Sequence, residues 1–383
     1  MSPVEPCPHR PPCPGCPRYG EPGIAAAARE ALDATARDAG LTPPRVVEGA
    51  AFGFRHRARL MVRGRATSPK VGIFREGTHE IVDIPRCRVH HPLVNEVAAA
   101  VREAVRVTGV RPYADRTHSG VLRAVQVVVE RASRSAQLVL VGNATSPDSV
   151  RPLADVLVRG LGASLHSLWW NGQPERSNAI LGPHWERLAG PEAVRESIGG
   201  ADVFFPPGAF GQSHLDLADL LVARVHAWVP AGARVAELYC GCGPIGLGLL
   251  VRGAHLTFVE SAPGAVCGLE LGLAARSDAE RARARVVARE AGLALDALGD
   301  ADVVIADPPR KGLDAPVASA LAATPPARLV YVSCDLDSFR RDLALLVAGG
   351  ALRLAEIEAY ALFPNTGHVE TVARFERIGR GAE

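Results

Sequence analysis

Four of the eight cysteines in this 383-residue chain have a spacing that could bind a metal ion or an iron–sulfur cluster. Cys7, Cys13 and Cys16 follow the pattern C-x5-C-x2-C in a stretch rich in proline and glycine, and Cys87 comes after 70 intervening residues. In a cytosolic protein, where thiols stay reduced, such clustering favours a metal or cluster site over disulfides. Four thiolates can ligate a 4Fe-4S cluster or a tetrahedral zinc ion, and the spacing alone does not separate these two.

A second group of residues could bind a nucleotide-like ligand. Gly241, Gly243 and Gly246 follow the apolar segment RVAEL and allow a tight turn from a strand into a helix, so that a ligand can approach the backbone. Glu260 ends the next predicted strand, where its carboxylate could accept hydrogen bonds from two ribose hydroxyls. The glycine pattern alone fits a dinucleotide equally well.

The segment Asp307-Pro308-Pro309-Arg310 separates these possibilities, because a dinucleotide domain has no need of it. An acid or amide followed by Pro-Pro resembles the segment at which base-modifying methyltransferases bring methyl donor and base together. Arg310 stands where enzymes that methylate amino groups usually carry an aromatic residue, so methylation of an exocyclic nitrogen is disfavoured.

Cys334 follows at the C-terminal end of the next predicted strand, the edge at which open α/β sheets hold their ligands. It is either a small core residue or a nucleophile, and its position at the same edge as Asp307 favours the nucleophile. We also expect the N-terminus of a helix starting near Leu336 to lower the pKa of the Cys334 thiol.

The elements that must position these residues fall into two predicted domains. The first, residues 1–200, is an α+β domain that carries the cysteine cluster, with predicted elements at 23–40, 52–91, 121–142 and 151–171. In residues 201–383 strands alternate with helices, which predicts a parallel sheet with right-handed crossovers. This pattern and a final hairpin around ALFPNTGH predict a doubly wound α/β sheet, as in class I, Rossmann-like methyltransferases.

The overall composition is typical of a folded protein, with 48% hydrophobic and 22% charged residues. No apolar stretch approaches the ~18 residues that a membrane span needs, and the N-terminus lacks a signal-peptide core, so we expect a cytoplasmic protein without membrane contact. Between residues 51 and 95, nine basic residues outnumber three acidic ones, which predicts a nucleic-acid footprint. Arginines at every second position of an extended segment lie on one face, where several guanidiniums could contact an RNA backbone. These arginines are Arg55, Arg57, Arg59, Arg63 and Arg65.

The segments ELYCGCGPIG, ADPPRKGL, VSCD and FPNTGHVETV, in this order and with C-x5-C-x2-C upstream, resemble the RNA uracil-C5 methyltransferase family. The resemblance also includes FGQSH and GFRHRARLMV, and so covers most of the chain. It implies S-adenosyl-L-methionine as methyl donor, Cys334 as nucleophile and Glu370 as general base. It further implies contacts to the donor from Gln212, Tyr239, Gly241, Gly243, Glu260 and Asp307.

Family members that carry the four-cysteine cluster and lack an extra N-terminal β-barrel modify large-subunit ribosomal RNA. The resemblance therefore implies a 4Fe-4S cluster rather than zinc, and a loop of 23S ribosomal RNA as the substrate of a monomeric enzyme. The chain departs from the family at His214, where asparagine is usual, and at Asp335-Leu336, where Asn-Pro is usual. Glu290 is the candidate acid for contacting the donor's adenine.

The chemistry of uracil explains why such an enzyme needs a thiol. The C5 carbon is too weak a nucleophile to attack a sulfonium methyl group until a thiolate adds at C6, and a base must later remove the C5 proton. Three alternatives stay open: a transfer RNA substrate, a cytosine-C5 RNA methyltransferase, and a non-enzymatic iron–sulfur RNA-binding protein. The cytosine enzyme is expected to carry a second cysteine near Pro-Pro, and none lies around Asp307.

Overall fold

The computed structural model describes residues 5–379, and the chain divides into two compact units. Unit 1 contains the chain up to Gly20, Ala50–Glu196 and Pro206–Gly208. Unit 2 contains Glu21–Gly49, Ser197–Phe205 and the chain from Ala209 onward. The units therefore differ from a simple division at residue 200, because Glu21–Gly49 packs with unit 2.

Unit 1 is built on a seven-stranded sheet with the order β4-β3-β2-β5-β6-β7-β8. Neighbouring strands are antiparallel except β6 and β7, which run parallel. The predicted hairpin at 121–142 is confirmed as β5 and β6. The strands are β2 (Arg57–Arg65), β3 (Ser68–Phe74), β4 (Ile81–Asp83), β5 (Leu122–Glu130), β6 (Ser135–Gly142), β7 (Leu165–Gly172) and β8 (His184–Ala189).

Two helices, α2 (Pro92–Thr108) and α3 (Arg151–Leu161), pack against each other and against this sheet. The sequence analysis did not predict α2, although its signals are present. The ring of His91 accepts a hydrogen bond from the backbone N–H of Leu93, proline is the first residue, and Gly109 ends the helix at a positive φ of 68°. Its apolar side is buried in the core of unit 1.

Unit 2 contains an eight-stranded sheet with the order β1-β16-β17-β15-β14-β11-β12-β13. All neighbours are parallel except β17, which is antiparallel to both β15 and β16. This is the predicted doubly wound sheet with its closing hairpin. The strands are β1 (Arg45–Val47), β11 (Arg234–Leu238), β12 (His255–Val259), β13 (Ala284–Val287), β14 (Val303–Ala306), β15 (Arg328–Ser333), β16 (Leu352–Tyr360) and β17 (Glu370–Arg377).

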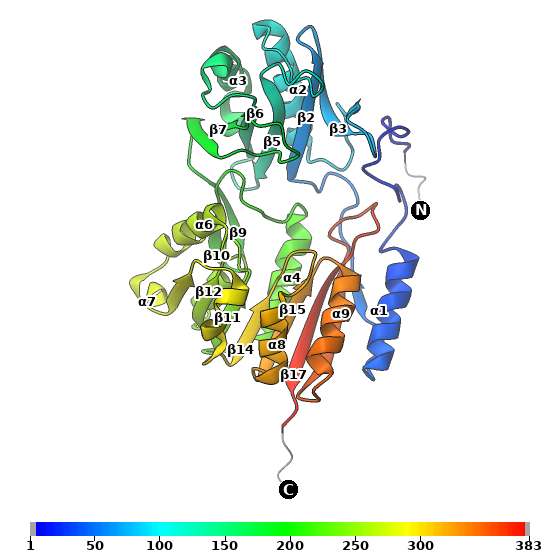
Figure 1. Cartoon of the computed structure of the whole chain (residues 1–383), viewed down its shortest axis with the longest axis vertical. Coiled ribbons are helices and arrows are strands. Elements are labelled where there is room, and N and C mark those ends of the chain that lie inside the picture. Colours follow the sequence, from blue (N-terminus) through cyan, green and yellow to red (C-terminus); the bar gives the residue numbers. More distant parts are fainter. Residues whose placement is uncertain (1–4, 380–383) are drawn as a thin grey trace. The chain divides into compact units, whose positions relative to one another are not determined.

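Helices cover both faces of this sheet, so its central strands are apolar on both sides. One face is covered by α1 (Ala26–Asp38), α8 (Ala315–Ala323) and α9 (Leu336–Val347), which Figure 1 shows side by side. The other face is covered by α4 (Leu215–Trp228), α5 (Gly246–Val251) and α6 (Pro263–Ala274). Unit 2 also contains the short helix α7 (Asp278–Arg281) and a hairpin formed by the end of β9 (Val194–Ile198) and by β10 (Ala201–Phe205).

The segment Glu21–Gly49 belongs to unit 2 because its apolar side chains pack against the sheet of that unit. Leu32 and Ala36, one helical turn apart, are fully buried against the sheet, so α1 is a core helix on one side rather than a simple surface helix. Strand β1 then extends the sheet, with Val47 opposite Tyr360 of β16. No helix among the described residues is long and apolar enough to cross a membrane.

Candidate active site

Three side chains that the sequence predicts to form the site lie at the C-terminal edge of the parallel strands in unit 2. Asp307 directly follows β14 and Cys334 directly follows β15, two neighbouring parallel strands. Glu370 begins β17, and the next residue, Thr371, lies opposite Ser333 in the antiparallel ladder. The fold thus brings the acid of the Pro-Pro segment, the thiol and the loop glutamate together, as the sequence analysis predicts.

The two acids at this edge are held in an environment that disfavours their charged forms. Glu370 is only 1% exposed, and its Oε2 atom has no hydrogen-bond partner among the described residues. Burial, and then the charge of Asp307, raise the pKa of Glu370 well above its usual range, while Arg310 opposes this shift. Burial also raises the pKa of Asp307 to about 7. Both carboxyl groups are therefore stronger bases than ordinary surface acids.

The Cys334 thiol is half-buried beside these carboxyl groups. Burial, and then the charges of Glu370 and Asp307, raise its pKa to about 11, and the nearby Arg310 only partly opposes this rise. The expectation that the N-terminus of α9 lowers the pKa is wrong. That helix end is already capped by the carboxylate of Asp335, which accepts a hydrogen bond from the backbone N–H of Ser338 at 2.9 Å.

The glycine-rich turn after β11 is held in shape by Glu260. The Glu260 Oε2 atom accepts a hydrogen bond from the Gly241 N–H at 2.9 Å, and Oε1 accepts from the N–H groups of Ser261 and Ala262 at 2.8 and 2.7 Å. Gly241 and Gly243 both have positive φ angles, and a Cβ atom added at Gly241 would meet nothing within 4 Å. The turn is therefore open at its glycine backbone, as a ligand-binding turn must be.

A further carboxylate, Glu237, lies beneath this turn and was missed by the sequence analysis. It is 2% exposed, its carboxylate accepts a backbone hydrogen bond from Gly246, and its Oε2 atom has no partner among the described side chains. Burial, and then the charges of Asp307 and Glu260, raise its pKa well above the usual range. An acid inside the apolar strand RVAEL was the signal available in the sequence.

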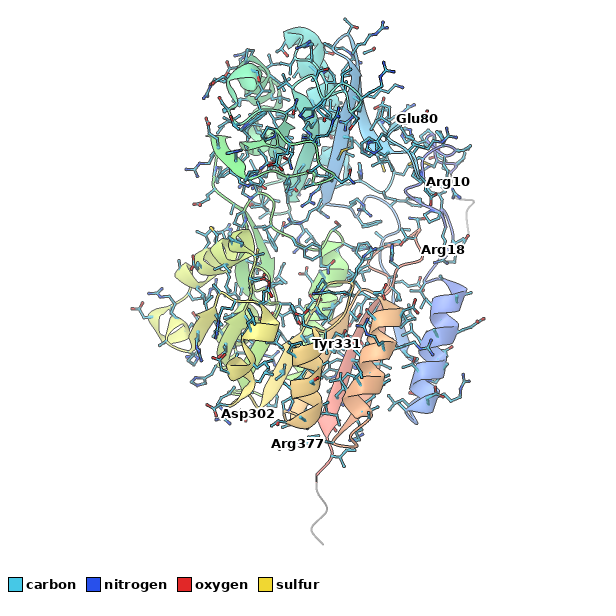
Figure 2. The ribbon with its side chains drawn as sticks, viewed as in Figure 1. Arg10, Arg18, Glu80, Asp302, Tyr331 and Arg377 are labelled. Carbon is cyan, nitrogen blue, oxygen red and sulfur yellow. The ribbon has the colours of Figure 1, made fainter. Side chains whose placement is uncertain are left out.

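The loop after Asp307 is tied to helix α9 by a second residue that the sequence analysis missed, Asp342. Its Oδ2 atom accepts hydrogen bonds from the Tyr331 hydroxyl at 2.7 Å and from the Leu313 N–H at 2.8 Å. Asp342 is 1% exposed, and Tyr331 is fully buried in the sheet (Figure 2). In the same loop, Arg310 lies 3.5 Å from His368 Nε2, next to the segment that leads into Glu370.

Comparison with known proteins agrees with this arrangement. Residues 273–378, which contain Asp307, Cys334 and Glu370, match the family described as tRNA (Uracil-5-)-methyltransferase. A protein named as an uncharacterized RNA methyltransferase from Protochlamydia amoebophila is 34% identical over 379 residues, which is 97% of each chain. The chain belongs to the RNA uracil-C5 methyltransferase family.

Two further proteins similar to this RNA methyltransferase support the assignment. An uncharacterized RNA methyltransferase from Geobacter sulfurreducens is 33% identical over 84% of this chain and 65% of its own length. The crystal structure of the Pyrococcus abyssi tRNA (uracil-54, C5)-methyltransferase in complex with S-adenosyl-L-homocysteine superimposes with a TM-score of 0.74 at 25% identity. That match covers 91% of this chain and 81% of the other. The fold is therefore that of a Rossmann-like, S-adenosyl-L-methionine-dependent methyltransferase.

His214 and Asp335, the two positions that depart from the family pattern, are both N-cap residues of helices in this methyltransferase. His214 is buried at the start of α4, and its ring Nδ1 accepts a hydrogen bond from the Leu217 N–H at 3.4 Å. Asp335 caps α9 in the same way. Each side chain caps a helix, because each offers an acceptor to a free backbone N–H.

The remaining predicted donor contacts of the methyltransferase lie in unit 2, in different settings. Gln212 is half-buried in the loop before α4, and Glu290 is exposed just after β13. Tyr239 has a positive φ of 58°, and its hydroxyl donates a hydrogen bond to Asp314 Oδ2 at 3.1 Å. The Tyr239 hydroxyl is thus directed at the loop after the Pro-Pro segment.

The four cysteines of the N-terminal pattern lie around one cavity of about 160 Å³ in unit 1. Burial, and then the charges of Cys87, Cys13 and Cys7, raise the pKa of Cys16 to about 11. Arg55 lines the same cavity, so the expected row of guanidiniums on one strand face does not include it. In the described part of the chain, no three His, Cys, Asp or Glu side chains are arranged as a ready metal site.

Proposed function

We propose that this protein methylates C5 of a uridine in RNA through a covalent adduct between Cys334 and C6 of the base. The observation that carries the proposal is the convergence of Cys334, Asp307 and Glu370 at one sheet edge. S-adenosyl-L-methionine, when bound, supplies an electrophilic methyl group. The glycine-rich turn, which is open at Gly241, would hold this donor together with Gln212, Tyr239, Gly243, Glu260 and Asp307.

The proton transfers of the reaction involve Cys334, Glu370 and solvent. The raised pKa of Cys334 keeps its thiol protonated at neutral pH, so the thiol passes its proton to solvent as the sulfur adds to C6, and Glu370 stays free for the later step. Addition moves charge onto the uracil O4 atom and makes C5 nucleophilic. After the new C–CH3 bond has formed, Glu370 takes the C5 proton, and the C6–S bond breaks as the C5–C6 double bond returns. A carboxylate with a raised pKa suits this step, since it is a stronger base than an ordinary glutamate.

The substrate base must leave its stack to reach this edge, at a cost of ~2–4 kcal/mol that is smallest in an unpaired loop. We propose a loop of 23S ribosomal RNA as the substrate, because the four-cysteine pattern is that of the ribosomal RNA branch which the sequence resembles. The Pyrococcus abyssi protein acts on uracil 54 of transfer RNA, so a transfer RNA loop is the second candidate. Mass-spectrometric mapping of 5-methyluridine in both RNAs, from cells with and without the gene, separates them.

We further propose that Cys7, Cys13, Cys16 and Cys87 bind a 4Fe-4S cluster. Their arrangement around one cavity supports this, as does Arg55, whose guanidinium would offset the negative charge of a thiolate-ligated cluster. The two histidines that line the cavity already have partners, since His9 Nε2 accepts from the Arg86 N–H at 3.2 Å and His90 Nδ1 lies 3.2 Å from Asn95 Oδ1. Anaerobically purified protein should contain about four irons per chain. Stoichiometric zinc without iron or sulfide would overturn the cluster.

Two variants test the catalytic roles. Cys334→Ala should abolish methylation and any covalent RNA complex, while donor binding is retained because the glycine turn is unchanged. Glu370→Gln keeps the shape of the side chain but cannot take the C5 proton, so elimination stalls and the covalent protein–RNA complex accumulates. A denaturing gel with labelled RNA reveals that complex as a slowly migrating band. Near-normal turnover by Cys334→Ala would show that the thiol is a core residue and that the mechanism is wrong.

A further inference from the structure

A second cavity in unit 1, of about 330 Å³, is lined entirely by residues with polar side chains, three of which are arginines. Three segments contribute to it: the loop after β3, the segment that precedes β5 together with the start of β5, and the loop after β7. Its charged lining residues are Arg116, Arg123, Arg176 and a single acid, Asp115. His79 also lines the cavity. We call it the arginine cavity.

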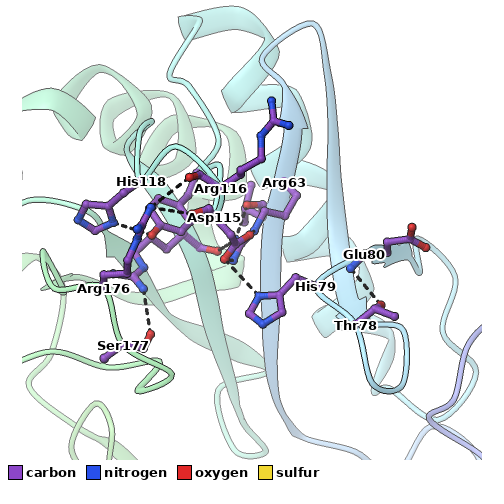
Figure 3. Close-up of polar contacts among 12 residues, drawn as sticks. Arg63, Thr78, His79, Glu80, Asp115, Arg116, His118, Arg176 and Ser177 are labelled. Atoms are coloured by element: carbon purple, nitrogen blue, oxygen red, sulfur yellow. Dashed lines mark hydrogen bonds and ion pairs between the residues drawn. The ribbon is translucent and has the colours of Figure 1, made fainter.

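The one acid of the arginine cavity is already neutralised. Asp115 accepts two hydrogen bonds from Arg63, at 2.6 Å from Nε and 3.0 Å from Nη2, and His79 Nδ1 lies 3.6 Å from its Oδ1 (Figure 3). The Arg63 side chain is only 11% exposed, so its guanidinium lies inside the protein, where it forms this ion pair. This corrects the expectation that Arg63 faces RNA phosphates, because its guanidinium is used inside the protein.

The three lining arginines, in contrast, have no carboxylate partner among the described residues. Arg123 Nη1 donates to the carbonyl oxygens of Gln173 and Glu175 at 2.6 and 2.7 Å. Arg176 Nη2 donates to the carbonyl oxygen of Arg116 at 3.1 Å. The exposed Arg116 guanidinium makes no hydrogen bond or ion pair within the described part of the chain. The cavity therefore has a net positive charge and unused N–H donors.

The aromatic side chains of the arginine cavity are already covered. The guanidiniums of Arg63 and Arg123 lie 5.1 and 4.5 Å from the centre of the Tyr113 ring. The His79 ring packs on Phe74 with their centres 5.2 Å apart. Because the rings are engaged and the free groups are guanidinium, amide and hydroxyl donors, the cavity suits an anion with several oxygen acceptors rather than a stacked base.

We propose that the arginine cavity binds a backbone phosphate of the RNA substrate, with Arg116 and Arg176 as its donors. This inference rests on the proposed function, since it takes RNA to be the substrate. Arg123 and Tyr113 form the rigid base of the cavity, because Arg123 is fixed to the carbonyl oxygens of the loop after β7. Phosphate contacts of this kind position the RNA and are independent of its sequence.

The test compares Arg116→Ala/Arg176→Ala with a control of equal charge loss, Arg106→Ala/Arg159→Ala. The control arginines lie on α2 and α3 and do not line the cavity. Fluorescence anisotropy with a labelled oligouridylate decamer should show at least ~10-fold weaker binding for the cavity variant and less than ~2-fold for the control. The salt dependence of RNA binding should fall in slope by about 0.7 in the cavity variant, the value for one lost single-strand phosphate contact.

Methylation assays and thermal unfolding complete the test. The cavity variant should raise the KM for RNA with little change in kcat, and its unfolding temperature should match the control's. Equal loss of RNA binding in both variants, or unchanged binding in the cavity variant, would overturn the proposal. So would complete displacement of the decamer from the wild-type protein by millimolar inorganic phosphate, which would identify a free-phosphate site. If wild-type protein binds RNA but forms no 5-methyluridine, the proposed function fails instead.

Discussion

Thr371 donates a hydrogen bond from its Oγ1 atom to the carbonyl oxygen of Ser333 at 3.2 Å. Both residues are buried, and each is the direct neighbour of a catalytic candidate, Glu370 and Cys334 respectively. The contact therefore fixes the base relative to the nucleophile in the middle of the sheet. It also explains why the carboxyl group of Glu370 affects the ionisation of the Cys334 thiol.

The raised pKa of Cys334 predicts how its reactivity depends on pH. Its thiol should be mostly protonated at pH 7, so alkylation by iodoacetamide should accelerate about tenfold per pH unit and reach no plateau below about pH 11. Arg310→Ala should slow alkylation further, because Arg310 favours the thiolate. Peptide mass spectrometry at Cys334 measures the rate. A plateau near pH 7 would contradict the arrangement of the two acids around the thiol.

Glu370→Gln should stabilise the protein at neutral and alkaline pH. The folded-state pKa of Glu370 is raised, so its contribution to stability is complete below the unfolded value near 4.5 and is lost as the pH rises toward the folded value. Glutamine at this position cannot ionise, so the variant does not lose this stability as the pH rises. The unfolding temperature should therefore rise by ~2–6 °C at pH 8, with the difference vanishing near pH 4. Glu356→Gln, at a partly exposed acid of β16 that is paired with arginines, serves as the contrast and should not stabilise.

Asp342→Ala should loosen the loop that carries Arg310 and Lys311. Two buried hydrogen bonds to a carboxylate are lost, which should destabilise unit 2 by ~2–4 kcal/mol and lower methylation about tenfold. Asp342→Asn keeps an oxygen that can accept both bonds and should recover most of the activity. Asp337→Ala, at an exposed acid of the same helix, is the matched control. Chemical denaturation and methylation assays measure the two effects.

Cys87→Ser should lose iron and destabilise unit 1, because one of the four proposed thiolate ligands is removed. Iron content and visible absorbance should fall together, and unit 2 should keep its own unfolding transition. Cys267→Ser, at a half-buried cysteine of α6 in unit 2, should leave the iron content unchanged. Full iron content in the Cys87 variant would remove this residue from the ligand set.

Much of unit 2 follows from local sequence signals. Alternation of apolar strands with helices, the glycines after RVAEL and the terminal hairpin predict the sheet that is observed, and the ends of its strands predict that Asp307 and Cys334 meet. The position of Glu370 follows from the last strand pair in the same way. These features depend on residues near each other in the chain, or on the general rule that parallel strands share one ligand-binding edge.

The tertiary structure alone decided the rest. The helix at Ala26–Asp38 is legible in the sequence, but its place in unit 2 depends on a distant sheet that buries Leu32. The ionisation of Cys334 was mispredicted from the adjacent helix, because the nearby acids come from other strands and their effect grows with burial. Arg63 likewise pairs with Asp115, 52 residues away. A sequence shows which groups can ionise, but only packing determines which charges face one another in a medium of low dielectric constant.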